Sequence, residues 1–154
     1  MADNESEDFR RFLQTRRADV AQAYVQGDSE PLRAMATEQD PASFFGPGGN
    51  MVQGVTRVNE AYLEGARSFS AAGSTRLEVL HHCASEGLAF LAGYQHATVV
   101  LNGNPEPVVM KLRITEVFRR EDGEWKLVHR HADAQGQGQR ARPAQGSGSL
   151  LFRP

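Results

Sequence analysis

Several features that define large protein classes are scarce in this chain of 154 residues. Its single cysteine, Cys83, excludes an internal disulfide and is typical of a reducing compartment. The net charge is -2, so the chain has no excess of basic residues with which to capture nucleic acid. No apolar run approaches the roughly 18 residues of a membrane span, and the acidic first residues contain no apolar signal core. We therefore expect a cytoplasmic protein with no nucleic-acid or membrane partner.

What is present is the composition of an ordinary globular protein, with 40% hydrophobic and 23% charged residues. We expect one domain, residues 1–134, because this length can bury a sizeable core. Residues 135–154 are rich in Gly, Gln, Ser and Pro, and this composition predicts a flexible tail. Near its end, Leu150, Leu151 and Phe152 form a small apolar patch that could dock on its own domain or on a partner.

The first half of the domain carries helical patterns. Apolar residues at i, i+3, i+4 spacing predict a helix from Ser6 or Glu7 to about Gln26, which Gly27 ends. Asp28 predicts the start of a short second helix, with Pro31 in its first turns. Residues 37–49 contain at most two short extended pieces and a Gly-Pro-Gly-Gly turn. A further amphipathic helix is expected from about residues 52 or 55 to 71.

The second half alternates apolar and polar residues with the period of β-strands. Four long strands are predicted, over residues 75–85, 88–101, 108–120 and 125–133. Short turns join them, and the Asp122-Gly123 pair is a strong hairpin signal, so the strands form an antiparallel meander. Helices followed by such a meander predict an α+β fold, in which a strongly curved sheet and its helices enclose a conical cavity suited to a small ligand.

Two polar residues are predicted to line this cavity together. His96 and Glu116 occupy even-numbered positions of adjacent strands, on the face that also carries Tyr94 and several apolar residues. A carboxylate among apolar neighbours is a candidate general acid or base, and pairing with it would fix one tautomer of the imidazole and leave the other ring nitrogen facing a ligand. We therefore predict His96 and Glu116 as catalytic residues and Tyr94 as a ligand contact. The alternative is a buried polar pair with a purely structural role.

The last strand offers two opposite faces. His129, His131 and Asp133 share one face with Trp125 and Leu127, whereas Arg130 points the other way. A single β-bulge would exchange these faces, so Arg130, His129 and His131 all remain candidate ligand contacts. A His-x-His pair can also hold zinc or iron, with Asp133, His81 or His82 as a third ligand, but we expect neither metal nor cofactor. A dimer interface on this face is the favoured alternative.

Two tyrosines of the predicted helices complete the candidate site. Tyr24 lies near the end of the first helix and Tyr62 in the later long helix. Each is a core aromatic residue or, if it borders the cavity, a ligand contact through its hydroxyl.

The order of elements and several motifs resemble the NTF2-like superfamily. The motifs are Gly27-Asp28, the Phe-Phe-Gly-Pro-Gly-Gly turn, residues 49–54, and the stretch FRREDGEWKLVHRH at residues 118–131. Over about residues 6–134 the chain is similar to SnoaL-like and ketosteroid-isomerase-like proteins, and to the association (hub) domain of calcium/calmodulin-dependent kinase II. The resemblance implies a cone of two to three N-terminal helices on a strongly curved antiparallel sheet, and a homodimer.

The resemblance also bears on chemistry. In ketosteroid isomerase the catalytic Asp precedes the proline of this turn, whereas Gly46 precedes Pro47 here and offers no base. In the hub domain, pocket arginines bind small carboxylates, and their positions fall on His96, Glu116 and Ala132. That cationic cluster is therefore expected to be absent, with Arg130 as a candidate replacement.

Two functions follow from the sequence. The first is a small-molecule-binding protein, with an isomerase, cyclase, hydratase or lyase reaction on a small organic ligand left open. The second is a non-catalytic association module in which the sheet faces oligomerise. The Gly46 substitution favours the second, and the polar residues expected in the cavity favour the first.

Overall fold

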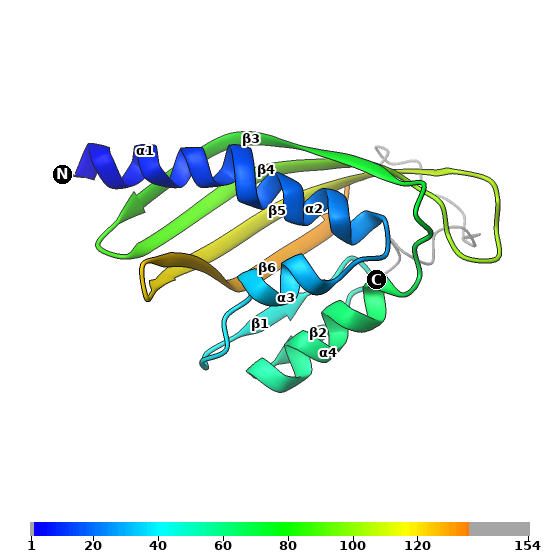
Figure 1. Cartoon of the computed structure of the whole chain (residues 1–154), viewed down its shortest axis with the longest axis horizontal. Helices are drawn as coiled ribbons and strands as arrows, with labels where there is room; N and C mark the ends of the chain where they lie inside the picture. Colours follow the sequence, from blue (N-terminus) through cyan, green and yellow to red (C-terminus); the bar gives the residue numbers. More distant parts are fainter. Residues whose placement is uncertain (1, 136–154) are drawn as a thin grey trace.

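The computed structural model describes residues 2–135 of the chain, so the predicted tail, apart from Gln135, lies outside the described residues. Helices form its first part (Figure 1). The first helix is continuous but changes pitch, from α1 (Ala2–Phe12) through the π-helical η1 (Leu13–Arg17) to α2 (Ala18–Val25). Two shorter helices follow, α3 (Glu30–Met35) and α4 (Val55–Ala66). The predicted helices are confirmed, although the first begins earlier and the last ends earlier than expected.

Six strands form one curled sheet. They are β1 (Ser43–Phe45), β2 (Met51–Gln53), β3 (Ser74–Ser85), β4 (Leu88–Val99), β5 (Val108–Glu121) and β6 (Glu124–Ala134), in the order β2-β1-β6-β5-β4-β3. The last four form the predicted antiparallel meander, and β1 runs parallel to β6. Asp122 and Gly123 both have positive φ, 50° and 81°, as a type I′ hairpin turn requires. The α+β cone expected from the sequence is confirmed.

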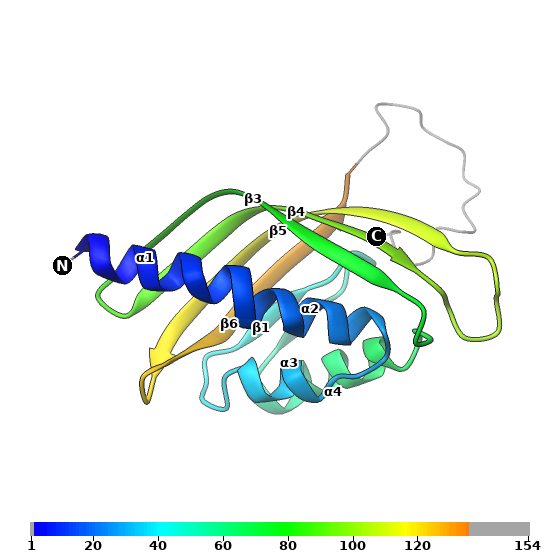
Figure 2. The same cartoon turned by 45° about the horizontal axis from the view of Figure 1, so that its top comes forward.

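The helices cover only one face of the sheet, here called the inner face (Figures 1 and 2). At one end of the cone this layer is filled by aromatic packing, with the Phe9 ring 5.3 Å from that of Phe118 and 5.2 Å from that of Trp125. The opposite, outer face has no helix upon it among the described residues. No helix in this part of the chain is long and apolar enough to span a membrane.

A β-bulge in β6 decides which of its residues face inward. Val117 pairs with His129 but Phe118 pairs with Leu127, so the intervening residue of β6 has no partner. Trp125 and Leu127 are buried on the inner side before the bulge, and Ala132 is buried after it. The exchange of faces turns Arg130 inward, whereas His129 and His131 lie outward.

The predicted inner face of β4 is wrong. Leu91 pairs with Glu116 and Gln95 with Leu112, so the odd positions of β4 share a face with the even positions of β5. Residues directly opposite each other in an antiparallel pair point to the same side, and the turn length sets which positions are opposite. His96 and Tyr94 therefore lie on the outer face, and Gln95 lies on the inner one.

Candidate functional site

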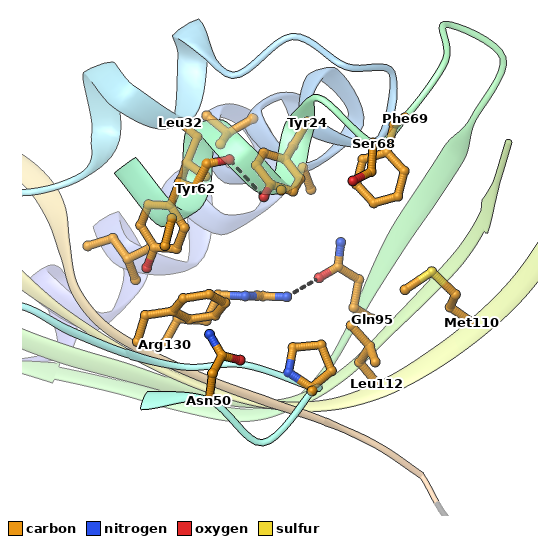
Figure 3. A pocket seen from close by; sticks show the side chains of 18 of the residues that line it. Tyr24, Leu32, Asn50, Tyr62, Ser68, Phe69, Gln95, Met110, Leu112 and Arg130 are labelled. Atoms are coloured by element: carbon orange, nitrogen blue, oxygen red, sulfur yellow. Dashed lines mark hydrogen bonds between the residues drawn. The ribbon is translucent and has the colours of Figure 1, made fainter. Parts of the chain in front are cut away.

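A cavity of about 330 Å³ lies between the inner face of the sheet and the helices α2, α3 and α4 (Figure 3). Most of its lining is apolar, as in typical small-molecule sites. The apolar lining includes Val20, Ala21, Leu32, Phe44, Phe69, Met110, Leu112 and Leu127, and the polar side chains are Arg17, Tyr24, Asn50, Tyr62, Ser68, Gln95 and Arg130.

The floor of the cavity rests on a buried ion cluster of Arg17, Glu116 and Arg130. Arg17 donates two parallel hydrogen bonds to the Glu116 carboxylate, Nε to Oε1 at 2.8 Å and Nη2 to Oε2 at 2.7 Å. Arg130 donates from Nη1 to the same Oε2. Glu116 is 0% exposed, Arg17 4% and the Arg130 side chain 14%. Paired fork geometry of this kind is the strongest arrangement between guanidinium and carboxylate.

Local structure explains how these three charges meet. Glu116 and Arg130 are directly opposite each other in the β5–β6 ladder, beyond the bulge that turns Arg130 inward. Arg17 is the last residue of the π-helical turn η1, on the stripe of the first helix that faces the core. Such π-turns are found often at functional sites. Without the bulge, Arg130 would point to the outer face, away from Glu116.

The cluster carries a net positive charge. Burial alone would raise the pKa of Glu116, but the charges and hydrogen bonds of Arg17 and Arg130 outweigh burial and lower it to about 2. The carboxylate is therefore ionised at neutral pH, and guanidinium groups keep their charge in proteins. Two cations against one anion leave one positive charge at the cavity floor.

The polar groups around this charge are mostly donors. Arg130 Nη2 donates to Gln95 Oε1 at 2.8 Å (Figure 3). Gln95 Nε2 in turn donates to Thr75 Oγ1 at 3.2 Å. This chain fixes the amide of Gln95 with its oxygen engaged and one N–H free. The Arg130 bonds use two of the five N–H donors of a guanidinium. Gln95 Oε1 and the Glu116 carboxylate are thus engaged as acceptors, while Arg130 and Gln95 keep free N–H donors.

The two cavity tyrosines stay protonated at neutral pH. Burial raises the pKa of Tyr24 to about 12, and burial raises that of Tyr62 as well. The Tyr24 hydroxyl donates to the backbone oxygen of Tyr62 at 3.0 Å. This contact depends on Gly65, because a Cβ atom there would lie 2.3 Å from the Tyr24 oxygen.

The structure brings together some of the predicted residues and separates others. Tyr24, Tyr62 and Arg130 line the cavity, and Glu116 lies directly behind Arg130. The expected pairing of His96 with Glu116 is wrong. His96 Nε2 is instead 2.8 Å from Glu78 Oε1, on the outer face.

The other predicted ligand contacts also lie on the outer face. Tyr94 lies there beneath the ammonium of Lys111, 4.4 Å from its ring centre. His129 Nδ1 is 2.7 Å from Ser43 Oγ, and the ring of His131 stands 5.3 Å from that of Phe45. Among the described residues, no group of three or more His, Cys, Asp or Glu side chains is arranged to hold a metal ion.

Four polar residues of the cavity were missed in the sequence: Arg17, Asn50, Ser68 and Gln95. Phe9, Leu13, Arg17 and Ala21 are all buried at a strict spacing of four, so the position of Arg17 was visible as an arginine on an apolar stripe. Gln95 shares the odd-numbered positions of β4 with buried Leu91 and Ala97. Assigning these positions to the inner face would have identified Gln95 as a cavity residue. The hub-domain arginine positions hold His96, Glu116 and Ala132 as expected, but Arg17 and the predicted replacement Arg130 supply a cationic cluster from other positions.

Comparisons with known proteins agree with this architecture. Residues 14–133 match the family model of the SnoaL-like domain. A Streptomyces avermitilis protein, provisionally named a dehydratase of the NTF2-like family, has a TM-score of 0.70 at 20% identity, covering 88% of this chain and 99% of that chain. An NTF2-like superfamily protein from Salmonella enterica serovar Typhimurium has a TM-score of 0.71 at 14% identity, covering 88% and 96%.

A third solved structure is a Thiobacillus denitrificans protein provisionally named a calcium/calmodulin-dependent protein kinase type II association domain. It has a TM-score of 0.61 at 16% identity, covering 78% of this chain and 91% of that chain. No curated protein sequence matches the chain. At these identities the likeness concerns the fold, and it confirms the NTF2-like resemblance seen in the sequence.

Proposed function

This chain belongs to the family of SnoaL-like domains, and we propose that it binds a small organic carboxylate in its cavity, against Arg130. The observation that carries the proposal is the unbalanced charge of the Arg17–Glu116–Arg130 cluster. A buried charge without a counter-ion is costly, and an anionic ligand would neutralise it. Arg130 is the better contact because its side chain is more exposed than that of Arg17.

The donor-rich floor supports the same ligand class. A carboxylate has only acceptors, and it can satisfy the free N–H groups of Arg130 and the free Nε2–H of Gln95 together. The primary amide of the same compound would present its own N–H groups to these donors. The apolar walls, among them Phe69 and Leu112, suit a hydrophobic or aromatic body.

The lining supports binding more than proton transfer. Among the described residues, the cavity lining contains no histidine and no aspartate. Glu116 behind it has a pKa of about 2 and accepts bonds from two arginines, so it is a poor base at neutral pH. The position before Pro47, where ketosteroid isomerase has its catalytic Asp, is occupied by Gly46 and offers no base. A dehydratase reaction, as in the provisional name of the Streptomyces relative, would need a proton acceptor from elsewhere.

Matched acids and amides test the proposal. We would titrate benzoate, phenylacetate and cinnamate, and the three corresponding amides, into the protein by calorimetry. The acids are expected to bind roughly 10- to 100-fold more tightly, because hydrogen bonds to a charged group contribute about 1.5–3 kcal/mol. Equal affinity for acids and amides would contradict the proposal.

Arginine variants locate the binding group. Arg130→Met should abolish the preference for acids while retaining the fold, since Arg17 still neutralises Glu116. The matched control is Arg113→Met, because Arg113 forms a similar forked pair with Asp133 on the outer face. Loss of acid binding in both variants, or in neither, would argue against Arg130 as the ligand contact.

A second candidate function, self-association as a homodimer, is favoured by the outer face. Two neighbouring cross-strand rows there contain no Asp, Glu, Lys or Arg, and charge depletion marks interface cores. We call these rows the uncharged belt: Met51, Phe45, His131, Thr115, Ala92 and His81, and then Gln53, Ser43, His129, Val117, Phe90 and Cys83.

The solution mass of a belt variant tests this candidate. Phe90 is 37% exposed within the belt, and Val109 is 78% exposed outside it. If the belt is a dimer interface, Phe90→Glu should halve the mass measured by light scattering and the control Val109→Glu should not. A wild-type protein that is already a monomer, or a Phe90→Glu variant that remains a dimer, would count against it.

A further inference from the structure

A second hollow lies on the outer face, beyond the turn that joins β1 to β2. It is an open groove of about 510 Å³ lined by Phe45, Gly46, Pro47, Gly49, Asn50, Met51, Arg113, His131, Asp133 and Ala134. Phe45 and Met51 are 38% and 59% exposed at its edge. Arg113 and Asp133 neutralise each other through two hydrogen bonds. The groove therefore offers apolar side chains beside a wall without net charge.

The chain leaves the described domain at this groove. Ala134, the last residue of β6, is part of its lining. The next residue, Gln135, donates its backbone N–H to the carbonyl of Lys111 at 3.1 Å. The sequence continues over residues 136–154, in which the large apolar side chains are those of Leu150, Leu151 and Phe152.

We propose that Leu150–Phe152 bind in the groove of their own chain and cover Phe45 and Met51. Residues 136–149 join the two parts, and a stretch of this length reaches at most roughly 45–50 Å. The 11 residues of β6 span roughly 37 Å, so the whole groove is within reach. A tethered segment also has an effective concentration on the order of millimolar, which favours its own chain over a free partner.

The surroundings of the exit favour the groove over the strands directly beside Gln135. Beside Gln135 the neighbouring strands carry Lys111, His96 and Arg76 in one cross-strand row. An apolar segment gains little against such a row, because charged side chains keep their water. The groove instead pairs a hollow with two exposed apolar side chains.

Disulfide trapping in the full chain tests the proposal, with exposed Cys83 first replaced by serine. Arg153→Cys places a thiol next to the apolar segment without changing it. Gln53→Cys places the second thiol beside Met51 on the outer face of β2. In the control, Thr98→Cys replaces Gln53→Cys.

The control site is nearer to the chain exit than the test site. Thr98 pairs with Val109, two residues from the Lys111 carbonyl that binds Gln135. Gln53 pairs with Ser43, which pairs with His129, six residues before Gln135. A tail without a docking site would therefore reach Thr98 more often than Gln53.

The expected result is an intramolecular disulfide that forms at least ten-fold faster with Gln53→Cys than with Thr98→Cys. Adding Leu151→Asp and Phe152→Asp should remove this difference. Equal rates, a faster reaction at Thr98→Cys, or a difference that survives the two aspartates would overturn the proposal. A disulfide between two chains would also overturn it, because the segment would then dock on a second copy.

The groove and the ligand cavity share two lining residues, so docking in the groove would also affect the cavity. Pro47 and Asn50 belong to the linings of both the groove and the ligand cavity. A docked Leu150–Phe152 would therefore contact the turn that closes one side of the cavity. Docking itself is independent of whether the cavity binds a carboxylate, so the trapping experiment tests it separately from the ligand. Docking excludes a dimer through this end of the uncharged belt, because Phe45, Met51 and His131 belong to both the groove and the belt.

Discussion

Glu116→Gln measures the strength of the buried ion cluster. The carboxylate is 0% exposed and accepts hydrogen bonds from Arg17 and Arg130. Glutamine keeps the shape but removes the charge, and its amide N–H groups face guanidinium donors. Arg17, only 4% exposed, would then be a buried cation without a counter-ion. We expect the free energy of unfolding to fall by about 3–5 kcal/mol, the usual cost of breaking a buried pair on one side.

The lowered pKa of Glu116 indicates a similar fall in the free energy of unfolding. Its fall from 4.5 to about 2 corresponds to about 3 kcal/mol of preference for the ionised carboxylate. A domain of this length commonly has a total stability of about 5–15 kcal/mol. The variant should therefore fold, with a melting temperature lower by roughly 10 °C.

Urea unfolding provides the assay, followed by fluorescence of Trp125. This side chain is the only tryptophan and is 3% exposed, so its emission reports exposure of the core. Asp133→Asn is the matched control, because Asp133 forms a forked pair with Arg113 in a far more exposed position, worth at most about 1 kcal/mol. Equal losses in Glu116→Gln and Asp133→Asn would show that burial adds nothing to the strength of the ion cluster.

Two further predictions follow from the same contacts. Because the folded-state pKa of Glu116 is lowered, its contribution is present above pH 4.5 and is lost toward pH 2. Wild-type stability should thus fall by about 2 kcal/mol more than that of Glu116→Gln between pH 5 and 2.5 in urea unfolding, and parallel pH profiles would contradict this. Gly65→Ala should cost about 1–3 kcal/mol, since its Cβ would lie 2.3 Å from the Tyr24 hydroxyl. Adding Tyr24→Phe should recover most of the melting temperature, and failure to do so would place the strain elsewhere.

The fold was predictable because its signals are local. Strand alternation and the Asp122-Gly123 turn defined the meander, and both depend on residues adjacent in sequence. Amphipathic spacing defined the helices in the same way. Each of these signals survives small errors in the position of an element's ends.

The candidate site was only partly predictable because it depends on which face each residue occupies. One unpaired residue in β6 turned Arg130 inward and His129 outward, and no propensity marks that bulge. The pairing of β4 with β5 placed Gln95, not His96, in the cavity. Each is a shift of one residue with a large effect on the chemistry. Arg17 differs from these, because its place on the apolar stripe of the first helix was visible in the sequence.

The most direct test of carboxylate binding at Arg130 is a high-resolution crystal structure of the protein with the acid that binds best. The carboxylate should lie within about 2.7–3.2 Å of Arg130 nitrogens, with the body of the ligand between Phe69 and Leu112. A cavity filled by its own side chains, or an acid bound away from Arg130, would contradict it.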